Sequence, residues 1–131
     1  PTLVLKDGAP VLSISVAGGD LQDQATLGLI LDFVDFGMAP EQAVRAPRFA
    51  TALHQDSFDP NRDRRATMGA PVLSINETVP AAVRQDLARR GHQVETKAAP
   101  IAVPVMIYVD AARGQLHAAG DPATGRHAAG L

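Results

Sequence analysis

Two adjacent glycines, Gly18 and Gly19, are the residues whose type and position in this sequence best suit catalysis. They separate a run that predicts a β-strand from a run that predicts a helix. Backbone N–H groups at such a turn can converge on a developing negative charge, assisted by the helix N-terminus. Acyl-transfer enzymes stabilise the oxyanion of a tetrahedral intermediate with this geometry. The simpler alternative is a tight turn between strand and helix, and the glycine pair alone does not distinguish the two.

The acidic residue that follows the glycines, Asp20, admits two interpretations. It is either the N-cap of the following helix or a contact for a cationic group of a substrate in the pocket. A phosphate-binding loop is not expected at this turn. The sequence lacks the glycine-rich patterns that hold phosphates, and Asp20 and Asp23 would repel a phosphate.

No residue of the chain is a convincing nucleophile or metal ligand. Ser13 and Ser15 lie within a predicted strand, without the sharp turn that exposes a nucleophilic serine. The spacing of His117, Asp121 and His127 matches no zinc pattern, so we expect exposed or capping roles for them and predict no metal or other cofactor. The absence of Cys excludes thiol catalysis and Cys-ligated metal centres.

The composition is that of a folded globular chain. Of its 131 residues, 46% are hydrophobic and 20% are charged. The formal net charge is −2, so nothing draws the chain to nucleic acid or to an anionic membrane. No apolar run approaches the length of about 18 residues that a membrane-spanning helix needs. Aromatic residues make up only 4%, so a core built by this chain alone would be thin.

A hairpin and a helix must position the glycines. The β-rich runs Thr2–Lys6 and Pro10–Val16 flank a turn that contains Gly8, which predicts an antiparallel hairpin. In the second run apolar residues alternate with serines, so one face is apolar. A helix is expected over Leu21–Phe36, with apolar side chains over much of its circumference. Such a helix is largely buried in a complete protein, whereas in this chain alone we expect it to show an apolar side to water. This expectation indicates that the chain is a piece of something larger.

The rest of the chain adds further short helices and strands. The expected elements are a short helix over 40–45, an irregular polar stretch over 48–66, a strand over 72–75, a helix over 80–90, a strand over 93–96, and a second hairpin from 103–109 and 115–119. Within the polar stretch, Arg62, Arg64 and Arg65 are expected on a solvated face. This order of elements predicts an α+β protein with mostly antiparallel strands and packed helices.

Segments along nearly the whole chain resemble, in the same order, the small subunit of the gamma-glutamyltranspeptidases. These segments are Pro1–Gly8, Gly18–Asp20, Leu31–Met38, Glu41–Phe49, Val79–Pro80, Leu87–Val94, Ala119–Pro122 and Ala129–Gly130. No single segment is decisive, and together they are fairly specific.

The resemblance implies an enzyme with the αββα sandwich of the N-terminal nucleophile hydrolases, made as a zymogen that cleaves itself into a large and a small subunit. The new N-terminal Thr of the small subunit would attack a gamma-glutamyl amide such as glutathione. The acyl-enzyme would then pass to water or to an amino acid or peptide. On this resemblance Gly18 and Gly19 supply the oxyanion-hole N–H groups, and Asp20 is a weaker candidate for substrate binding.

The resemblance also accounts for the missing nucleophile. The Thr and the residues that grip the glutamate would lie upstream of Pro1, so residues 1–131 would be the C-terminal portion of a small subunit, an incomplete domain. Such a portion would be inactive alone. Its partners would be the large subunit or upstream segment of the same precursor and a small amide substrate.

Two departures from the family pattern keep alternatives open. Val16 and Ala17 stand where the family usually has Ser-Pro, and Asp20 and Leu21 follow the glycines where many members have Ser and Arg. Because Gly-Gly-Asp is typical of the divergent, acylase-like branch, a cephalosporin or glutaryl acylase of the same family is one alternative. A non-catalytic structural module is the other.

Overall fold

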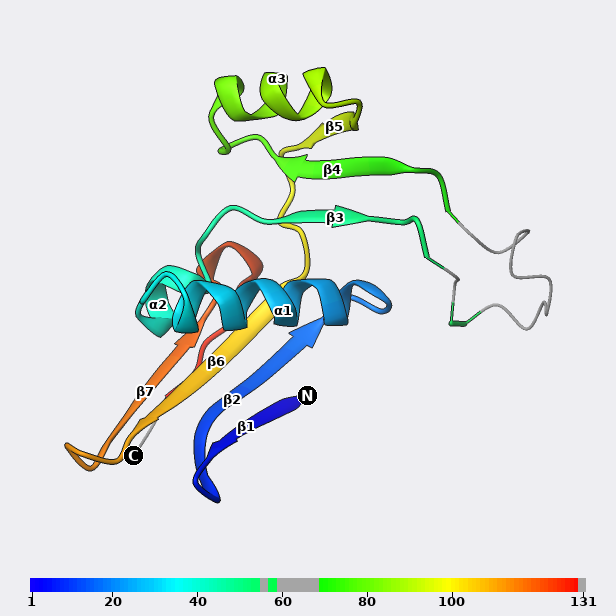
Figure 1. Cartoon of the computed structure of the whole chain (residues 1–131). Helices are drawn as coiled ribbons and strands as arrows, with labels where there is room; N and C mark the ends of the chain where they lie inside the picture. The colour runs from blue at the N-terminus through cyan, green and yellow to red at the C-terminus, as the bar shows by residue number, and fades with distance from the viewer. Residues whose placement is uncertain (55–56, 59–68, 130–131) are drawn as a thin grey trace. The chain divides into compact units, whose positions relative to one another are not determined.

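The computed structural model describes residues 1–54, 57–58 and 69–129. The chain divides into two compact units, which we call the first unit (Pro1–Ala46 with Ala102–Leu131) and the inserted unit (Pro47–Ile101). In the chain, the inserted unit interrupts the first unit between its second helix and its third strand (Figure 1).

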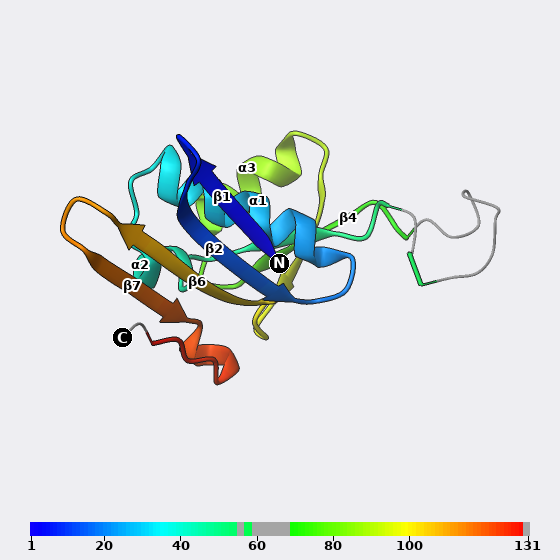
Figure 2. The ribbon, with the colours of Figure 1, turned by 90° about the horizontal axis from the view of Figure 1, so that it is seen from below.

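The first unit is built on four antiparallel strands in the order β1-β2-β6-β7 (Figure 2). Its elements are β1 (Thr2–Lys6), β2 (Ala9–Ala17), α1 (Leu21–Val34), α2 (Pro40–Ala43), β6 (Val103–Asp110), β7 (Gln115–Gly120) and the 3₁₀ turn η1 (Pro122–Thr124). Both predicted hairpins are confirmed, and the pairing of β2 with β6 joins them into one sheet. Helices α1 and α2 lie on the same face of this sheet.

The turn between β1 and β2 has the geometry that a two-residue hairpin requires. Asp7 and Gly8 both have positive φ, at 52° and 79°, which matches the right-handed twist of the flanking strands. Within β2 the predicted alternation is confirmed: Leu12, Ile14 and Val16 are at most 6% exposed and belong to the core, whereas the serines between them are exposed.

Helix α1 buries one side only. Ala25 and Leu29 join Met106 of β6 in the core, and Leu29 is 1% exposed. Leu27 and Val34 are 58% and 62% exposed, so this chain by itself leaves an apolar side of the helix uncovered, as the sequence predicted. The physical reason is that the sheet covers one side of a helix that is apolar on several sides.

The inserted unit holds a small mixed sheet in the order β3-β4-β5. Strand β3 (Phe49–Thr51) is antiparallel to β4 (Val72–Asn76), and β5 (Gln93–Lys97) is parallel to β4. Helix α3 (Ala81–Arg89) connects the two parallel strands, as a parallel pair requires.

Strand β3 lies within the stretch that was predicted to be irregular, so that prediction is wrong at residues 49–51. Three residues are too few to show an alternating pattern, and the strand exists because Phe49 pairs with Ile75 and Thr51 with Leu73. The cluster of Arg62, Arg64 and Arg65 lies outside the described residues.

Arg48 and Asn76 hold the two ends of the inserted unit together. The Arg48 backbone N–H donates to Asn76 Oδ1 at 2.8 Å, and Arg48 Nε donates to the Ile101 carbonyl at 2.6 Å. Asn76 Nδ2 donates to the Ala99 carbonyl at 3.2 Å. The segments that begin and end this unit are thereby tied side by side.

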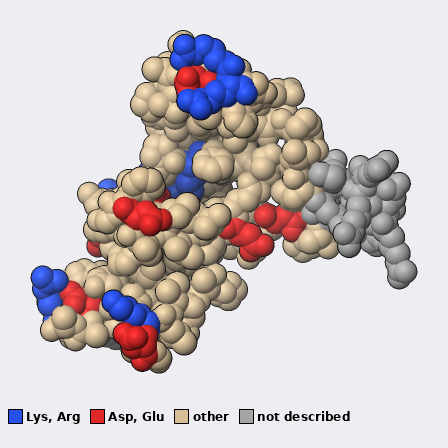
Figure 3. Space-filling view, viewed as in Figure 1, with Lys and Arg blue, Asp and Glu red and all other residues tan. Residues whose placement is uncertain are grey.

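Charged side chains gather over α3, whereas most of the face seen in Figure 3 is uncharged. Asp86 accepts hydrogen bonds from Arg89 at 3.1 Å and from Arg90 at 2.7 Å. All three side chains are exposed, so each pair contributes at most about 1 kcal/mol. Within the described part of the chain, no helix is both long and apolar enough to cross a membrane.

Candidate functional site

The glycine pair lies where the sheet ends and the first helix begins. Strand β2 ends at Ala17, which pairs with Val103 of β6. The Gly18 and Gly19 carbonyls then accept hydrogen bonds from the N–H groups of Leu21 and Gln22, each at 3.1 Å. Gly19 has a φ of 58°, a left-handed conformation that glycine adopts without strain. The predicted strand–Gly-Gly–helix unit is therefore present.

The two glycine N–H groups are not consumed by this turn. The β2–β6 register stops at Ala17, and within the described residues neither the Gly18 nor the Gly19 N–H donates a hydrogen bond. Two neighbouring donors beside a helix N-terminus can stabilise a negatively charged oxygen. Their role in binding an oxyanion stays a prediction.

Asp20 occupies the N-cap position of α1 but does not cap it. Its backbone is helical, with φ −67° and ψ −9°, and its carboxylate makes no capping hydrogen bond. Capping residues normally have an extended backbone, which aims the side chain at the N–H groups of the first turn. The capping interpretation is therefore wrong, and a contact with a substrate stays a prediction.

His117 and Asp121, in the C-terminal region, take part in packing and in a turn. His117 stacks on Tyr108 with ring centroids 5.7 Å apart. Asp121 is 3% exposed, and its Oδ1 accepts a hydrogen bond from the Ala123 N–H at the start of η1. Among the residues that the structure describes, no three His, Asp or Glu side chains are grouped as metal ligands.

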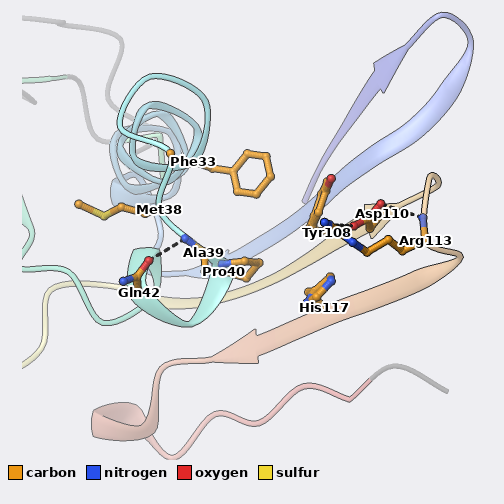
Figure 4. Close-up of a pocket in the computed structure, with 10 residues that line it drawn as sticks. Phe33, Met38, Ala39, Pro40, Gln42, Tyr108, Asp110, Arg113 and His117 are labelled. Atoms are coloured by element: carbon orange, nitrogen blue, oxygen red, sulfur yellow. Dashed lines mark hydrogen bonds and ion pairs between the residues drawn. The ribbon is translucent and has the colours of Figure 1, made fainter.

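A pocket of about 390 Å³ lies at the far end of β6 from the glycines (Figure 4). Tyr108 of β6 contacts Phe33 of α1, with ring centroids 4.9 Å apart, and His117 of β7 lies on its other side. The path along β6 from Val103, beside the glycine loop, to Tyr108 is about 17 Å at the usual rise of a strand. Neither Gly18 nor Gly19 lines this pocket. The pocket could not be predicted from the sequence because Phe33 is distant in the chain from the hairpin that carries Tyr108 and His117.

An ion pair between Asp110 and Arg113 lines this pocket. Arg113 donates to Asp110 Oδ2 from its side chain at 2.8 Å and to Oδ1 from its backbone at 3.1 Å. These contacts, led by the side-chain hydrogen bond, lower the pKa of the Asp110 carboxyl below its ordinary value, although burial opposes the shift. The pair closes the β6–β7 turn.

The lowered pKa predicts how this turn responds to acid. A carboxyl with a lowered pKa in the folded state stabilises the fold at neutral pH, and this contribution disappears as the pH falls below about 4. Replacing Asp110 with Asn should therefore lower the melting temperature of the full-length protein at pH 7 and have a smaller effect at pH 3. Thermal unfolding of both proteins across this range measures the difference. A difference that is constant with pH would contradict the assignment.

The fold and the loop define a class of protein. A helix-covered antiparallel sheet whose second strand runs through Gly18 and Gly19 into a helix has the α+β architecture of the N-terminal nucleophile hydrolases. The sequence profile of one family of this class, gamma-glutamyltranspeptidase, matches residues 1–131. The chain belongs to the gamma-glutamyltranspeptidase family, as the resemblance of its segments predicted.

Three relatives illustrate the range of similarity. A glutathione hydrolase proenzyme from a Pseudomonas strain is 45% identical over 49 residues, which are 37% of this chain and 8% of that protein. A mutant gamma-glutamyltranspeptidase from Helicobacter pylori is 27% identical with a TM-score of 0.73, over 94% of this chain and 59% of that chain. A cephalosporin acylase from Bacillus halodurans shares the fold, with a TM-score of 0.75 at 23% identity, over 92% of this chain and 20% of that chain. The matched regions thus span only part of each relative.

Proposed function

We propose that the whole protein transfers gamma-glutamyl groups from an amide such as glutathione to water or to an amine, and that this chain supplies its oxyanion-binding loop. The observation that carries the proposal is the pair of glycine N–H groups between β2 and α1, which neither the sheet nor the helix uses. Membership of the gamma-glutamyltranspeptidase family and the glutathione hydrolase name of a relative support the substrate class.

The proposed reaction has two acyl-transfer steps. A Thr outside this chain gives its hydroxyl proton to a base, and its Oγ forms a bond to the gamma-carbonyl carbon of the substrate. The carbonyl oxygen becomes an oxyanion, to which the Gly18 and Gly19 N–H groups donate hydrogen bonds. The C–N bond then breaks, the leaving amine takes up the proton, and an ester remains. Water or an acceptor amine attacks this ester in the same way and releases the Thr.

Asp20 is the proposed contact for the alpha-ammonium group of the substrate. It directly follows Gly18 and Gly19 at the start of α1 and is half-buried. A carboxylate at hydrogen-bond distance from an ammonium forms a charge-assisted hydrogen bond, which is stronger than a neutral one. This role would favour gamma-glutamyl groups over glutaryl groups, which have the same length but no amine.

We further propose that residues 1–131 are the C-terminal portion of a small subunit and that an upstream segment of the same precursor completes the domain. The 59% coverage of the Helicobacter chain supports this proposal. Exposed apolar side chains on β1, Leu3 at 61% and Leu5 at 56%, give it a physical basis, because they need a cover. The name proenzyme of the Pseudomonas relative supports maturation by cleavage.

An acylase that acts on cephalosporin or glutaryl amides is the second candidate, and the shared fold with a cephalosporin acylase favours it. A panel of chromogenic gamma-glutamyl and glutaryl anilides, assayed with the full-length enzyme, separates the candidates. We expect kcat/KM to be at least about 10-fold higher for the gamma-glutamyl anilide, which corresponds to about 1.4 kcal/mol.

The variant Asp20→Asn tests, in the same assay, whether Asp20 contacts the amine of the substrate. We expect it to lower kcat/KM for the gamma-glutamyl anilide by about 10-fold and to leave the glutaryl anilide within about 2-fold, since only the first substrate carries the amine. Preference for the glutaryl anilide would favour the acylase. No turnover of any anilide by the matured protein would favour the non-catalytic module.

A further inference from the structure

Ala102 has a backbone conformation that its sequence position does not require. Among the described residues, only Asp7 and Ala102 combine a side chain with a positive φ, at 52° and 60°. Asp7 lies in the β1–β2 turn, where this geometry is expected. Ala102 lies outside any hairpin turn, directly before β6, and is 8% exposed. A buried L-residue keeps a left-handed conformation only where its surroundings determine it.

The surroundings of Ala102 are those of the glycine loop. The next residue, Val103, pairs with Ala17, the last residue of β2 before Gly18. A β-carbon built on Gly18 would lie 3.5 Å from the β-carbon of Ala102 and 3.7 Å from its α-carbon. The Ala102 methyl therefore borders the space beside Gly18 where any other residue would carry its side chain.

We propose that Ala102 is the positioning residue of the oxyanion loop, a role that rests on the proposed function. Its left-handed backbone turns the methyl toward Gly18 at the point where β6 enters the sheet. The methyl then limits the movement of the Gly18 α-carbon and so fixes the direction of the N–H groups at Gly18 and Gly19. A displacement well below 1 Å at such a loop changes rate, because donors must point to where the oxyanion forms.

The variant Ala102→Gly separates positioning from folding, since glycine adopts this φ without strain but lacks the methyl. In the full-length enzyme we expect kcat for a gamma-glutamyl anilide to fall about 10-fold with KM within about 2-fold, because the loop loses precision and not binding area. We expect the melting temperature to be equal or higher. A merely structural residue would not produce this combination.

Two further variants serve as controls for Ala102→Gly. Ala102→Ser keeps the β-carbon and should retain at least about half of kcat. Asp7→Gly removes the same kind of strain at the opposite end of β2, so we expect an equal or higher melting temperature and an unchanged kcat. Rates are divided by the fraction of matured enzyme on a denaturing gel, so that incomplete maturation is not read as slow turnover.

The outcomes distinguish the positioning role of Ala102 from the oxyanion role of the glycine loop. A wild-type kcat in Ala102→Gly, or a loss of kcat that only accompanies a loss of melting temperature, would overturn the positioning role. If Gly18→Pro loses turnover while Ala102→Gly does not, the positioning role alone fails. If a folded Gly18→Pro enzyme keeps full turnover, the proposed oxyanion role fails, and the role of Ala102 fails with it.

Discussion

Replacing Gly18 with proline in the full-length enzyme is expected to lower the turnover number by about 10²–10³, the usual cost of removing one oxyanion donor. Proline has no N–H, so it removes the donor without adding a charge. Gly18 lies outside the left-handed region, and Ala17 before it is extended, as the residue before a proline prefers. Since the oxyanion forms only as the Thr attacks, in the transition state and the tetrahedral intermediate and not in the bound substrate, KM should change little.

Gly18→Ala is the matched control for this variant. It keeps the N–H, and its β-carbon would meet the β-carbons of Ala102 and Leu21 at 3.5 Å, an ordinary contact distance. We expect it to retain turnover within about 5-fold, well short of the loss of a donor. Steady-state kinetics with a gamma-glutamyl anilide, and circular dichroism to verify folding, measure both variants. Equal losses in the two variants would assign the effect to crowding at the loop and would falsify the donor role.

Replacing Leu29 with alanine is expected to destabilise the full-length protein by about 2–5 kcal/mol, the usual range for a fully buried leucine. Leu29 is 1% exposed and lies in the core with Ile14 and Met106. The truncation removes apolar contacts and leaves a cavity that the rigid sheet fills only in part. Because α1 begins directly after the glycine loop, a loosened helix should also lower kcat.

Leu27 provides the comparison for Leu29 on the same helix. It is the same residue type but 58% exposed in this chain, so its truncation leaves no cavity in the first unit. Urea unfolding of the two variants should show that Leu29→Ala costs at least about 2 kcal/mol more than Leu27→Ala. Similar costs would mean that the rest of the whole protein covers the Leu27 side of α1, and would contradict the expected difference.

Local sequence patterns predicted most of the elements. The alternation of apolar residues and serines in β2, with Asp7 and Gly8 before it, specified both the hairpin and its buried face. The strand–Gly-Gly–helix unit was predictable for the same reason, because each of its parts depends on residues close in the chain. The order of several short segments was enough to indicate the gamma-glutamyltranspeptidase family.

Side-chain roles at the loop were less predictable. Asp20 stands where a capping residue is expected, yet its helical backbone prevents the capping hydrogen bond. The three-residue β3 carries no periodic signal and exists only through its pairing with β4. In neither case does residue type alone decide the conformation.

The sequence by itself therefore determined the hairpins, the helices and the place of the two glycines between β2 and α1. Only the tertiary structure decided that β2 pairs with β6, which brings Ala102 against Gly18 although an inserted unit separates them in the chain. The reason is that periodicity encodes which face of a segment is apolar, whereas the choice of a distant partner depends on packing across the whole sheet. The positive φ of Ala102 likewise depends on tertiary packing, because alanine itself disfavours this conformation.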